Sequence, residues 1–320
     1  MQTPTIDDVN AAARRIAPHV RRTPLLRSEA LDALVGATVV VKAENLQRFG
    51  AFKARGAFNR IASFTPELRQ PGVLAYSSGN HAQAVAGAAR AFGVPAVIVM
   101  PADAPRVKID NTRALGGEIV LYDRVREDRE AIGATIAAAR GLALVKPFDD
   151  PFVIAGQGTV GLEIMEDFGL VDVALAPGSG GGLVTGLALA LTAHAPAVRV
   201  FAVEPAGHDD MARSLASGQR EVNATGVRSI CDALLSDRMG AIPFAIAQEK
   251  LAGALVVPDD AVRDAMRFAF RELRVVLEPG GAIALAAVLN GVIDVKGARV
   301  AIVASGGNVD PAQFAAIIAS

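Results

Sequence analysis

Short apolar runs alternate with longer, alanine-rich amphipathic segments along most of the 320-residue sequence. This alternation is typical of βαβ units, in which helices cover buried parallel strands. We expect strands at 37–42, 72–76, 96–100, 119–122, 142–146, 171–176, 198–203 and 299–304. The clearest expected helices are 81–91, 127–140, 154–168, 261–273 and 281–289. The pattern predicts an α/β protein, and because no repeat or long linker interrupts it, any second domain must be inserted within the first.

Charge and composition exclude several classes of protein. The 32 basic residues nearly balance the 33 acidic ones, so we expect no positive surface for a nucleic acid. The longest charge-free stretch, 173–198, is broken by Pro177 and by glycines, and the helix left at 183–193 is shorter than the roughly 20 residues that a bilayer needs. Cys231 is the single cysteine, and residues 1–10 lack the features of a signal peptide. We therefore expect a cytoplasmic protein that binds a small molecule, with no membrane or nucleic-acid partner.

Three predicted strands end in polar or glycine-rich turns that open a helix, at 77–81, 178–182 and 305–308. Ligands of open α/β sheets bind beyond the carboxyl ends of the strands, so these turns are expected to grip one ligand together. The glycines of 178–182 would let backbone N–H groups approach a phosphate, and the helix expected from about Gly182 adds its dipole. A plain tight turn has the same composition. No Lys-Ser or Lys-Thr pair follows, which excludes a Walker A loop, but Glu204, about 22 residues downstream, leaves a dinucleotide-binding loop as an alternative.

Lys53 follows a predicted strand at the point where a helix should start, and Phe52 precedes it. Most lysines are solvated surface groups. Partial burial and a nearby helix N-terminus would both lower the pKa of this amine and make it a nucleophile. Lys53 is therefore a candidate catalytic residue.

Four motifs in register resemble the fold-type II pyridoxal-phosphate enzymes. They are GAFKARGA at 50–57, SSGNH at 77–81, the loop 178–183 and SGGN at 305–308, and the segment 149–164 also matches. The closest likeness is to the branch of serine and threonine dehydratases, hydroxyaspartate dehydratases and serine racemase. The resemblance implies a fold like the tryptophan synthase β subunit, with two open, twisted, mostly parallel sheets flanked by helices. It further implies a large cofactor-binding domain, 1–46 and 147–320, and a smaller inserted α/β domain, 47–146.

The same resemblance implies how the cofactor is held. Lys53 would form the Schiff base with pyridoxal 5′-phosphate, and Phe52 would pack against the pyridine ring. Asn80 would bond the ring hydroxyl, and Ser305 would face the ring nitrogen. The phosphate would lie against the loop Ser179, Gly180, Gly181, Gly182 and Leu183. Ser179 stands where relatives have the first of four glycines, but its backbone N–H remains available.

Candidate substrate contacts lie in the turn 77–81 and in one arginine. The substrate carboxylate is expected where Ser77, Asn80 and His81 open a helix, although His81 could be an ordinary packing histidine. Arg129 resembles a substrate-pocket arginine of racemase relatives and would suit a dicarboxylic substrate; a helix-surface arginine is the alternative. Ser78 matches the residue that delivers a proton opposite the lysine in racemases, or it simply caps the following helix.

A divalent-cation site is expected after the strand 198–203. In the racemase and hydroxyaspartate dehydratase branch, a glutamate, an aspartate six residues later and a carbonyl between them bind Mg²⁺ or Ca²⁺. These map to Glu204, Asp210 and the backbone oxygen of His208, and hard cations favour such oxygen ligands. The alternative is that both acids merely end a strand and start a helix.

The resemblance implies an L-threonine or L-serine ammonia-lyase, commonly a homodimer, with Lys53 removing the α-proton before the β-hydroxyl leaves. Alternatives are a threo-3-hydroxyaspartate dehydratase, a serine racemase, and a non-enzymatic amino-acid-binding protein on the same fold. Ala51 stands where many relatives have serine before the Phe-Lys pair, which leaves the substrate preference open because this residue neighbours Lys53.

Overall fold

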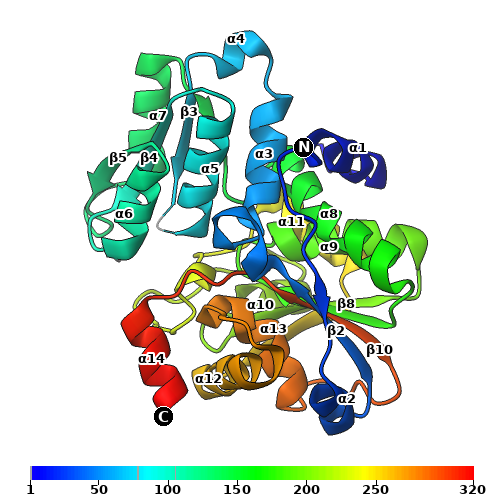
Figure 1. Cartoon of the computed structure of the whole chain (residues 1–320). Coiled ribbons are helices and arrows are strands. Elements are labelled where there is room, and N and C mark those ends of the chain that lie inside the picture. The colour runs from blue at the N-terminus through cyan, green and yellow to red at the C-terminus, as the bar shows by residue number, and fades with distance from the viewer. Residues whose placement is uncertain (1, 78, 105) are drawn as a thin grey trace.

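Two mostly parallel sheets organise the protein (Figure 1). The computed structural model describes residues 2–77, 79–104 and 106–320. The larger sheet has the strand order β1 (Leu25–Leu26), β2 (Thr38–Ala43), β10 (Arg299–Ala304), β7 (Val173–Pro177), β8 (Arg199–Pro205) and β9 (Gly253–Val257). The smaller sheet has the order β5 (Gly117–Tyr122), β4 (Ala96–Pro101), β3 (Val73–Tyr76) and β6 (Ala143–Leu144). Among the strands of the described residues, β1 and β2 are the one pair that is antiparallel, so the predicted α/β class with two mostly parallel sheets is confirmed.

Helices cover both faces of each sheet. On the larger sheet, one face packs against α2 (Glu29–Val35), α12 (Asp259–Phe268), α13 (Pro279–Leu289) and α14 (Pro311–Ala319). The other face packs against α8 (Pro151–Phe168), α9 (Gly182–His194), α10 (Asp210–Ser217) and α11 (Ala241–Lys250). On the smaller sheet, α3 (Lys53–Ser63), α5 (Asn80–Ala91) and α6 (Arg106–Ala114) lie on one face, and α7 (Arg129–Arg140) lies on the other. The chain also contains α1 (Ile6–Ile16) and the short helix α4 (Pro66–Arg69).

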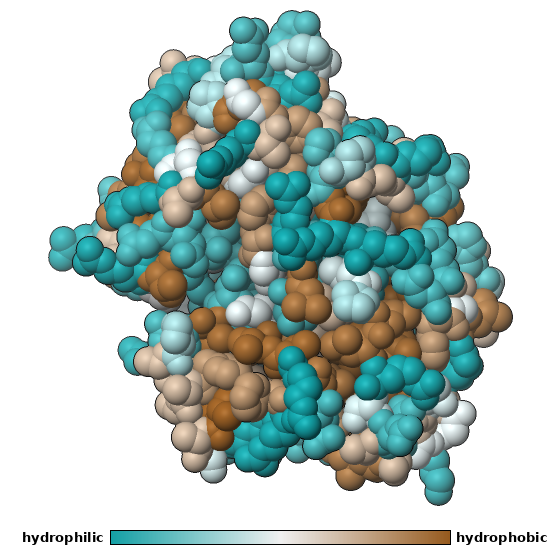
Figure 2. Space-filling model, viewed as in Figure 1, coloured by the Kyte–Doolittle hydropathy of each residue, from teal (hydrophilic) through white to brown (hydrophobic). Residues whose placement is uncertain are grey.

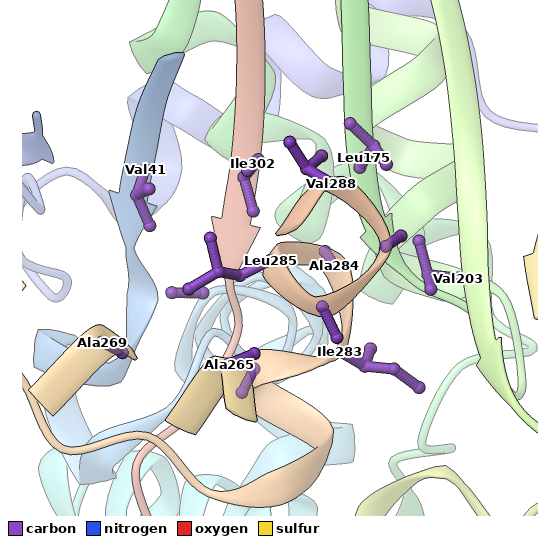
Figure 3. Close-up of a cluster of buried hydrophobic side chains, with 14 of the residues drawn as sticks. Val41, Leu175, Val203, Ala265, Ala269, Ile283, Ala284, Leu285, Val288 and Ile302 are labelled. Atoms are coloured by element: carbon purple, nitrogen blue, oxygen red, sulfur yellow. The ribbon is translucent and has the colours of Figure 1, made fainter. Parts of the chain in front are cut away.

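The core of the larger sheet shows why its strands read as continuous apolar runs. Val41, Ile302, Leu175 and Val203 come from four neighbouring strands and face Leu285 and Val288 of α13 (Figure 3). Parallel strands covered on both faces need apolar side chains in both directions. The alanines of α12 and α13 let these helices approach the sheet closely.

Several predicted boundaries were wrong, for local reasons. The expected strand 142–146 shortens to Ala143–Leu144, because Pro147 has no N–H to extend the ladder. The expected helix 127–140 starts at Arg129, where the Asp128 carboxylate caps the first turn. The expected helix 261–273 is α-helical only to Phe268 and ends in a π-helical turn, Ala269–Leu273. The edge strand β9 was missed; it is short, follows the polar end of α11 after two residues and is only partly buried.

A buried network of four charges lies beneath the start of α3. Arg55 donates from Nε and Nη2 to Glu44 at 2.8 Å, and its Nη1 lies 2.7 Å from Glu163. Lys42 Nζ lies 2.6 Å from Glu163 on the other side. The two cations and two carboxylates neutralise one another, which is the condition for burying such groups. The network fixes α3, whose first residue is Lys53.

The smaller sheet lies between residues 73 and 144, within the expected inserted unit, and the limits 47–146 remain a prediction.

On the face drawn in Figure 2, hydrophilic residues dominate the part that holds the smaller sheet, and hydrophobic surface gathers across the larger-sheet part. None of the helices in the described ranges has both the length and the apolarity required to cross a bilayer.

Candidate active site

The three turns named from the sequence meet in one cleft at the carboxyl ends of the strands. Ser77 follows β3, Gly178 follows β7 and Ser305 follows β10, and all three line a cleft with about 990 Å³ of empty space including its mouth. Phe52 and Lys53 at the start of α3 complete the wall. The structure therefore brings together residues that lie more than two hundred positions apart in the chain.

Lys53 directs its amine into this cleft. Nζ donates to the backbone oxygen of Pro147 at 2.7 Å and lies 5.1 Å from the centroid of the Phe52 ring. Burial lowers the pKa of Lys53 to about 8, because the charged form is poorly solvated there. The uncharged amine, which is the form that acts as a nucleophile or a base, is therefore more populated near neutral pH than in an ordinary lysine.

The loop from 178 to 182 is shaped to hold an anion. Ser179 and Gly181 have φ of 64° and 89°, which turns successive N–H groups toward the same side. The N–H groups of Ser179, Gly180 and Gly181 donate to no other residue in the described parts of the chain. A Cβ at Gly180 would lie 2.2 Å from the Phe148 ring, so only glycine fits there. Unused donors in front of the N-terminus of α9 match the phosphate of pyridoxal phosphate.

The turn after β3 combines a polar helix start with a buried histidine. His81 Nε2 lies 2.9 Å from the Val145 carbonyl, and since a carbonyl only accepts, Nε2 carries the proton. Burial, followed by the charge of Lys53, lowers the pKa of His81 to about 3. The ring is therefore neutral, and its Nδ1, which has no partner among the residues that the structure describes, can only accept a hydrogen bond. A carboxylate at this turn would meet the backbone N–H groups that open α5 rather than the imidazole. Ser78 lies outside the described residues.

A chain of buried polar side chains surrounds Asn80. Its Oδ1 accepts from Asn308 Nδ2 at 2.8 Å, and its Nδ2 donates to Glu278 Oε1 at 2.5 Å. The turn that contains Ser305 is tied to the start of α3, because Phe52 N–H donates to the Ser305 carbonyl at 3.0 Å. Ser305 is buried and lines the cleft. Asn80 and Ser305 thus stand in one wall with Lys53, as the predicted cofactor contacts require.

Arg129 lies at the rim of the same cleft. It is the first residue of α7, and its guanidinium lies 5.5 Å from the centroid of the Tyr76 ring. No carboxylate of the described residues comes within ion-pair distance of it. The guanidinium is therefore available to an anionic ligand in the cleft.

Sequence reasoning missed three charged residues of the cleft, which are Glu278, Lys108 and Asp232. Glu278 caps no helix with its side chain and is 1% exposed. Lys108 of α6 is buried and forms an ion pair with Asp232 of the 3₁₀ helix η3 (Asp232–Leu234), so this pair joins elements from opposite sides of the cleft. None of the three belongs to the motifs named in the sequence analysis.

The predicted metal ligands lie together behind the glycine loop. Glu204 is fully buried and accepts from the N–H groups of Met211 and Ala212 at 3.2 and 3.0 Å. Asp210, equally buried, accepts from Asn223 Nδ2 and from the N–H of Met239 at 2.6 and 2.7 Å. Burial, followed by the charge of Asp210, raises the pKa of Glu204 to about 8, and burial also raises that of Asp210.

The histidine between these acids does not bring its ring to them. His208 Nε2 lies 3.2 Å from the Val227 carbonyl instead. Within 2–77, 79–104 and 106–320, no group of three or more His, Cys, Asp or Glu side chains could hold a metal ion. Any cation here would therefore depend on two carboxylates and on backbone oxygen. Two neighbouring buried carboxylates repel each other when both are ionised, so either a proton or a cation is needed to offset their charge.

Comparison with known proteins gives a consistent result. A family model described as "Pyridoxal-phosphate dependent enzyme" matches residues 16–306. The chain is 42% identical to an L-threo-3-hydroxyaspartate ammonia-lyase of Saccharomyces cerevisiae, covering 99% of this chain and 97% of that protein. It is also 42% identical to an L-threonine ammonia-lyase of Thermotoga maritima, covering 96% and 76%. The structure of maize serine racemase superposes with a TM-score of 0.94 at 39% identity, covering 98% of this chain and 97% of that one.

Proposed function

Because the chain belongs to the family of pyridoxal-phosphate-dependent enzymes, alongside ammonia-lyases and racemases, we propose that it removes water and ammonia from a small β-hydroxy amino acid. The products would be a 2-oxo acid and ammonia. Arg129 lies at the rim of the cleft that contains Lys53 and has no ion-pair partner among the described residues, and this observation carries the choice among the possible substrates.

The cofactor would be held by polar groups that line the cleft. When bound, pyridoxal phosphate withdraws electrons from the α-carbon of an amino acid. Lys53 would attach the cofactor covalently, and the free N–H groups of Ser179 to Gly181 would receive its phosphate. Asn80 and Ser305 would contact the polar edge of the ring, with Phe52 beside it. Lys53 Nζ would be the base that takes the α-proton of a bound substrate.

Arg129 favours a dicarboxylic substrate over the L-threonine or L-serine expected from the sequence. The α-carboxylate would bind at the N-terminus of α5, which leaves the guanidinium for a second carboxylate. Among the relatives, L-threo-3-hydroxyaspartate is a substrate with this second group. We therefore propose L-threo-3-hydroxyaspartate first and L-threonine or L-serine second.

Turnover of the three amino acids by the purified holoenzyme, with identification of the product, tests this order. Arg129→Ala should lower kcat/KM for hydroxyaspartate about tenfold to hundredfold, since a hydrogen bond to a charged group contributes about 1.5–3 kcal/mol. For L-serine the change should stay within about threefold. Arg126→Ala, in a side chain that is 85% exposed, is the matched control. Equal losses for both substrates would remove Arg129 from substrate selection.

The chirality of recovered serine separates elimination from racemisation. If the holoenzyme interconverts L- and D-serine faster than it releases 2-oxo acid from any of the three amino acids, it is a racemase and the proposal is wrong. If the protein binds amino acids without turnover, the non-enzymatic alternative holds.

We further propose that Glu204, Asp210 and the backbone oxygen of His208 bind Mg²⁺ or Ca²⁺. The donor set is all oxygen, which suits hard cations, and a zinc site would need nitrogen or sulfur ligands. Glu204 is in contact with the glycine loop, because a Cβ at Gly178 would lie 2.6 Å from its Cγ. A cation would therefore act on the loop and not on the substrate.

A homodimer also remains a prediction, and measurement of molar mass in solution tests it.

A further inference from the structure

Glu278 touches two of the segments that would hold the cofactor ring. Its Oε1 accepts from Asn80 Nδ2 at 2.5 Å, and its N–H donates to the Gly306 carbonyl at 3.1 Å. A Cβ at Gly306 would lie only 2.2 Å from Oε1, so the carboxyl packs directly on the turn that begins with Ser305. The side chain thus links the residue expected at the ring hydroxyl to the turn expected at the ring nitrogen.

Helix capping does not explain why the carboxyl of Glu278 is buried. It precedes α13, but its side chain makes no capping hydrogen bond to that helix. Its second oxygen, Oε2, is buried and has no partner in the described residues, although the side chain lines the cleft. A buried carboxyl without a function normally costs stability and is not retained for packing.

The surroundings of Glu278 favour its neutral form. An ionised carboxylate here would have one hydrogen bond, from a neutral amide, and no directly bonded cation. The charged groups that face it are Lys108 of α6, which favours ionisation, and Asp232 of η3, which opposes it, and these two are paired with each other. Lys53 and His81 line the same cleft. Burial is the strongest influence and raises the pKa of Glu278 to about 7.

We propose that Glu278 positions Asn80 and the Ser305 turn around the ring of pyridoxal phosphate, and that it holds a proton on Oε2 while doing so. A neutral acid offers both an acceptor and a donor, whereas an ionised carboxylate only accepts. The neutral form therefore keeps Oε1 as the acceptor for Asn80 and provides a donor on the cleft side. This inference rests on the proposed cofactor site and not on which amino acid is the substrate.

Two variants separate charge from contact. Glu278→Gln keeps an acceptor for Asn80 and a donor on the other atom, but it cannot ionise. Glu278→Ala removes both. Glu249→Gln, at an exposed position of α11, is the control. The measurements are the affinity of the cofactor-free protein for pyridoxal phosphate, the absorption spectrum of the bound cofactor between pH 6 and 9, and thermal unfolding of the cofactor-free protein. None of these requires a substrate.

We expect Glu278→Ala to bind the cofactor about tenfold more weakly, the effect of one lost buried hydrogen bond. Glu278→Gln should bind the cofactor with an affinity within about threefold of wild type at pH 6.5. Between pH 6 and 8 the absorption spectrum of the bound cofactor should change less in this variant than in wild type, because the variant cannot ionise at this position. Its Tm relative to wild type should rise over the same range, because wild type alone acquires a buried charge.

Three results would overturn the proposal. The first is wild-type cofactor affinity and spectrum in Glu278→Ala. The second is Glu278→Gln binding as weakly as Glu278→Ala at pH 6.5, which would mean that the ionised carboxylate is required. The third is a wild-type pH response in Glu278→Gln, and this outcome decides the question even if the alanine variant does not fold. Failure of wild type to bind pyridoxal phosphate would instead refute the cofactor site itself.

Discussion

Removing the charge of Glu204 should change how the stability of the protein depends on pH. In the metal-free protein Glu204 is buried beside Asp210, and both effects raise its pKa to about 8 from the 4.5 of an ordinary glutamate. A group with a raised pKa in the folded state stabilises the fold only while it stays protonated. Its ionisation therefore lowers the free energy of unfolding progressively as the pH rises from about 4.5 through about 8.

The size of the effect follows from the shift. Each pKa unit corresponds to about 1.4 kcal/mol, so the metal-free protein should be about 4 kcal/mol less stable at pH 8 than it would be with a permanently neutral group. About half of that loss should fall between pH 6 and pH 8. Glu204→Gln keeps the shape and an oxygen that accepts from Ala212 N–H, but it carries no charge and should not show this loss.

The assay is urea unfolding of the cofactor-free protein at pH 6, 7 and 8, in EDTA and then with Mg²⁺ or Ca²⁺. Wild type in EDTA should lose about 2 kcal/mol relative to Glu204→Gln between pH 6 and 8. The cation should restore wild type at pH 8 and leave the variant unchanged, because a ligand stabilises only the state that binds it. Glu249→Gln should follow wild type throughout.

The same pH response in wild type and Glu204→Gln would refute the electrostatic reasoning. A response in EDTA that no cation reverses would keep the buried acid pair and remove the metal site.

Three further predictions concern single residues. Lys53→Ala should fold with a Tm near that of wild type but should lack both the absorbance of bound cofactor and turnover. Activity in this variant would refute the assignment of Lys53 as the residue that binds the cofactor covalently. Gly180→Ala should weaken cofactor binding at least about tenfold, because its Cβ would lie 2.2 Å from the Phe148 ring and the loop must move; unchanged affinity in a cofactor titration would contradict the proposed phosphate site. Arg55→Leu should destabilise the protein by about 3–5 kcal/mol in urea unfolding, since Glu44 would remain buried without its cation; a loss below about 1 kcal/mol would show that the network rearranges around the gap.

Much of the fold, and the turns that line the candidate site, followed from local sequence signals, whereas the cofactor and the roles of its contacts came from the resemblance to a family. Buried parallel strands give apolar runs, and turns at their carboxyl ends need glycine and small polar residues. Lys53, the loop 178–182 and the turns at 77–81 and 305–308 were identified for that reason. Each of these signals reports the backbone conformation of a few adjacent residues, which the sequence specifies directly. The alternation of runs likewise determined the α/β class with parallel sheets.

Tertiary structure alone decided which side chains meet in the cleft. Asn80 and Glu278 are 198 positions apart, and Lys108 and Asp232 are 124 apart, so no local pattern connects them. The pKa values of Lys53, His81 and Glu278 depend on burial, which is a property of the packed molecule. The availability of Arg129 likewise depends on which carboxylates the fold leaves out of its reach. The sequence by itself determined the elements and the glycine-rich turns, whereas partners and charge states were decided by packing, because desolvation and long-range contacts exist only once the chain has folded.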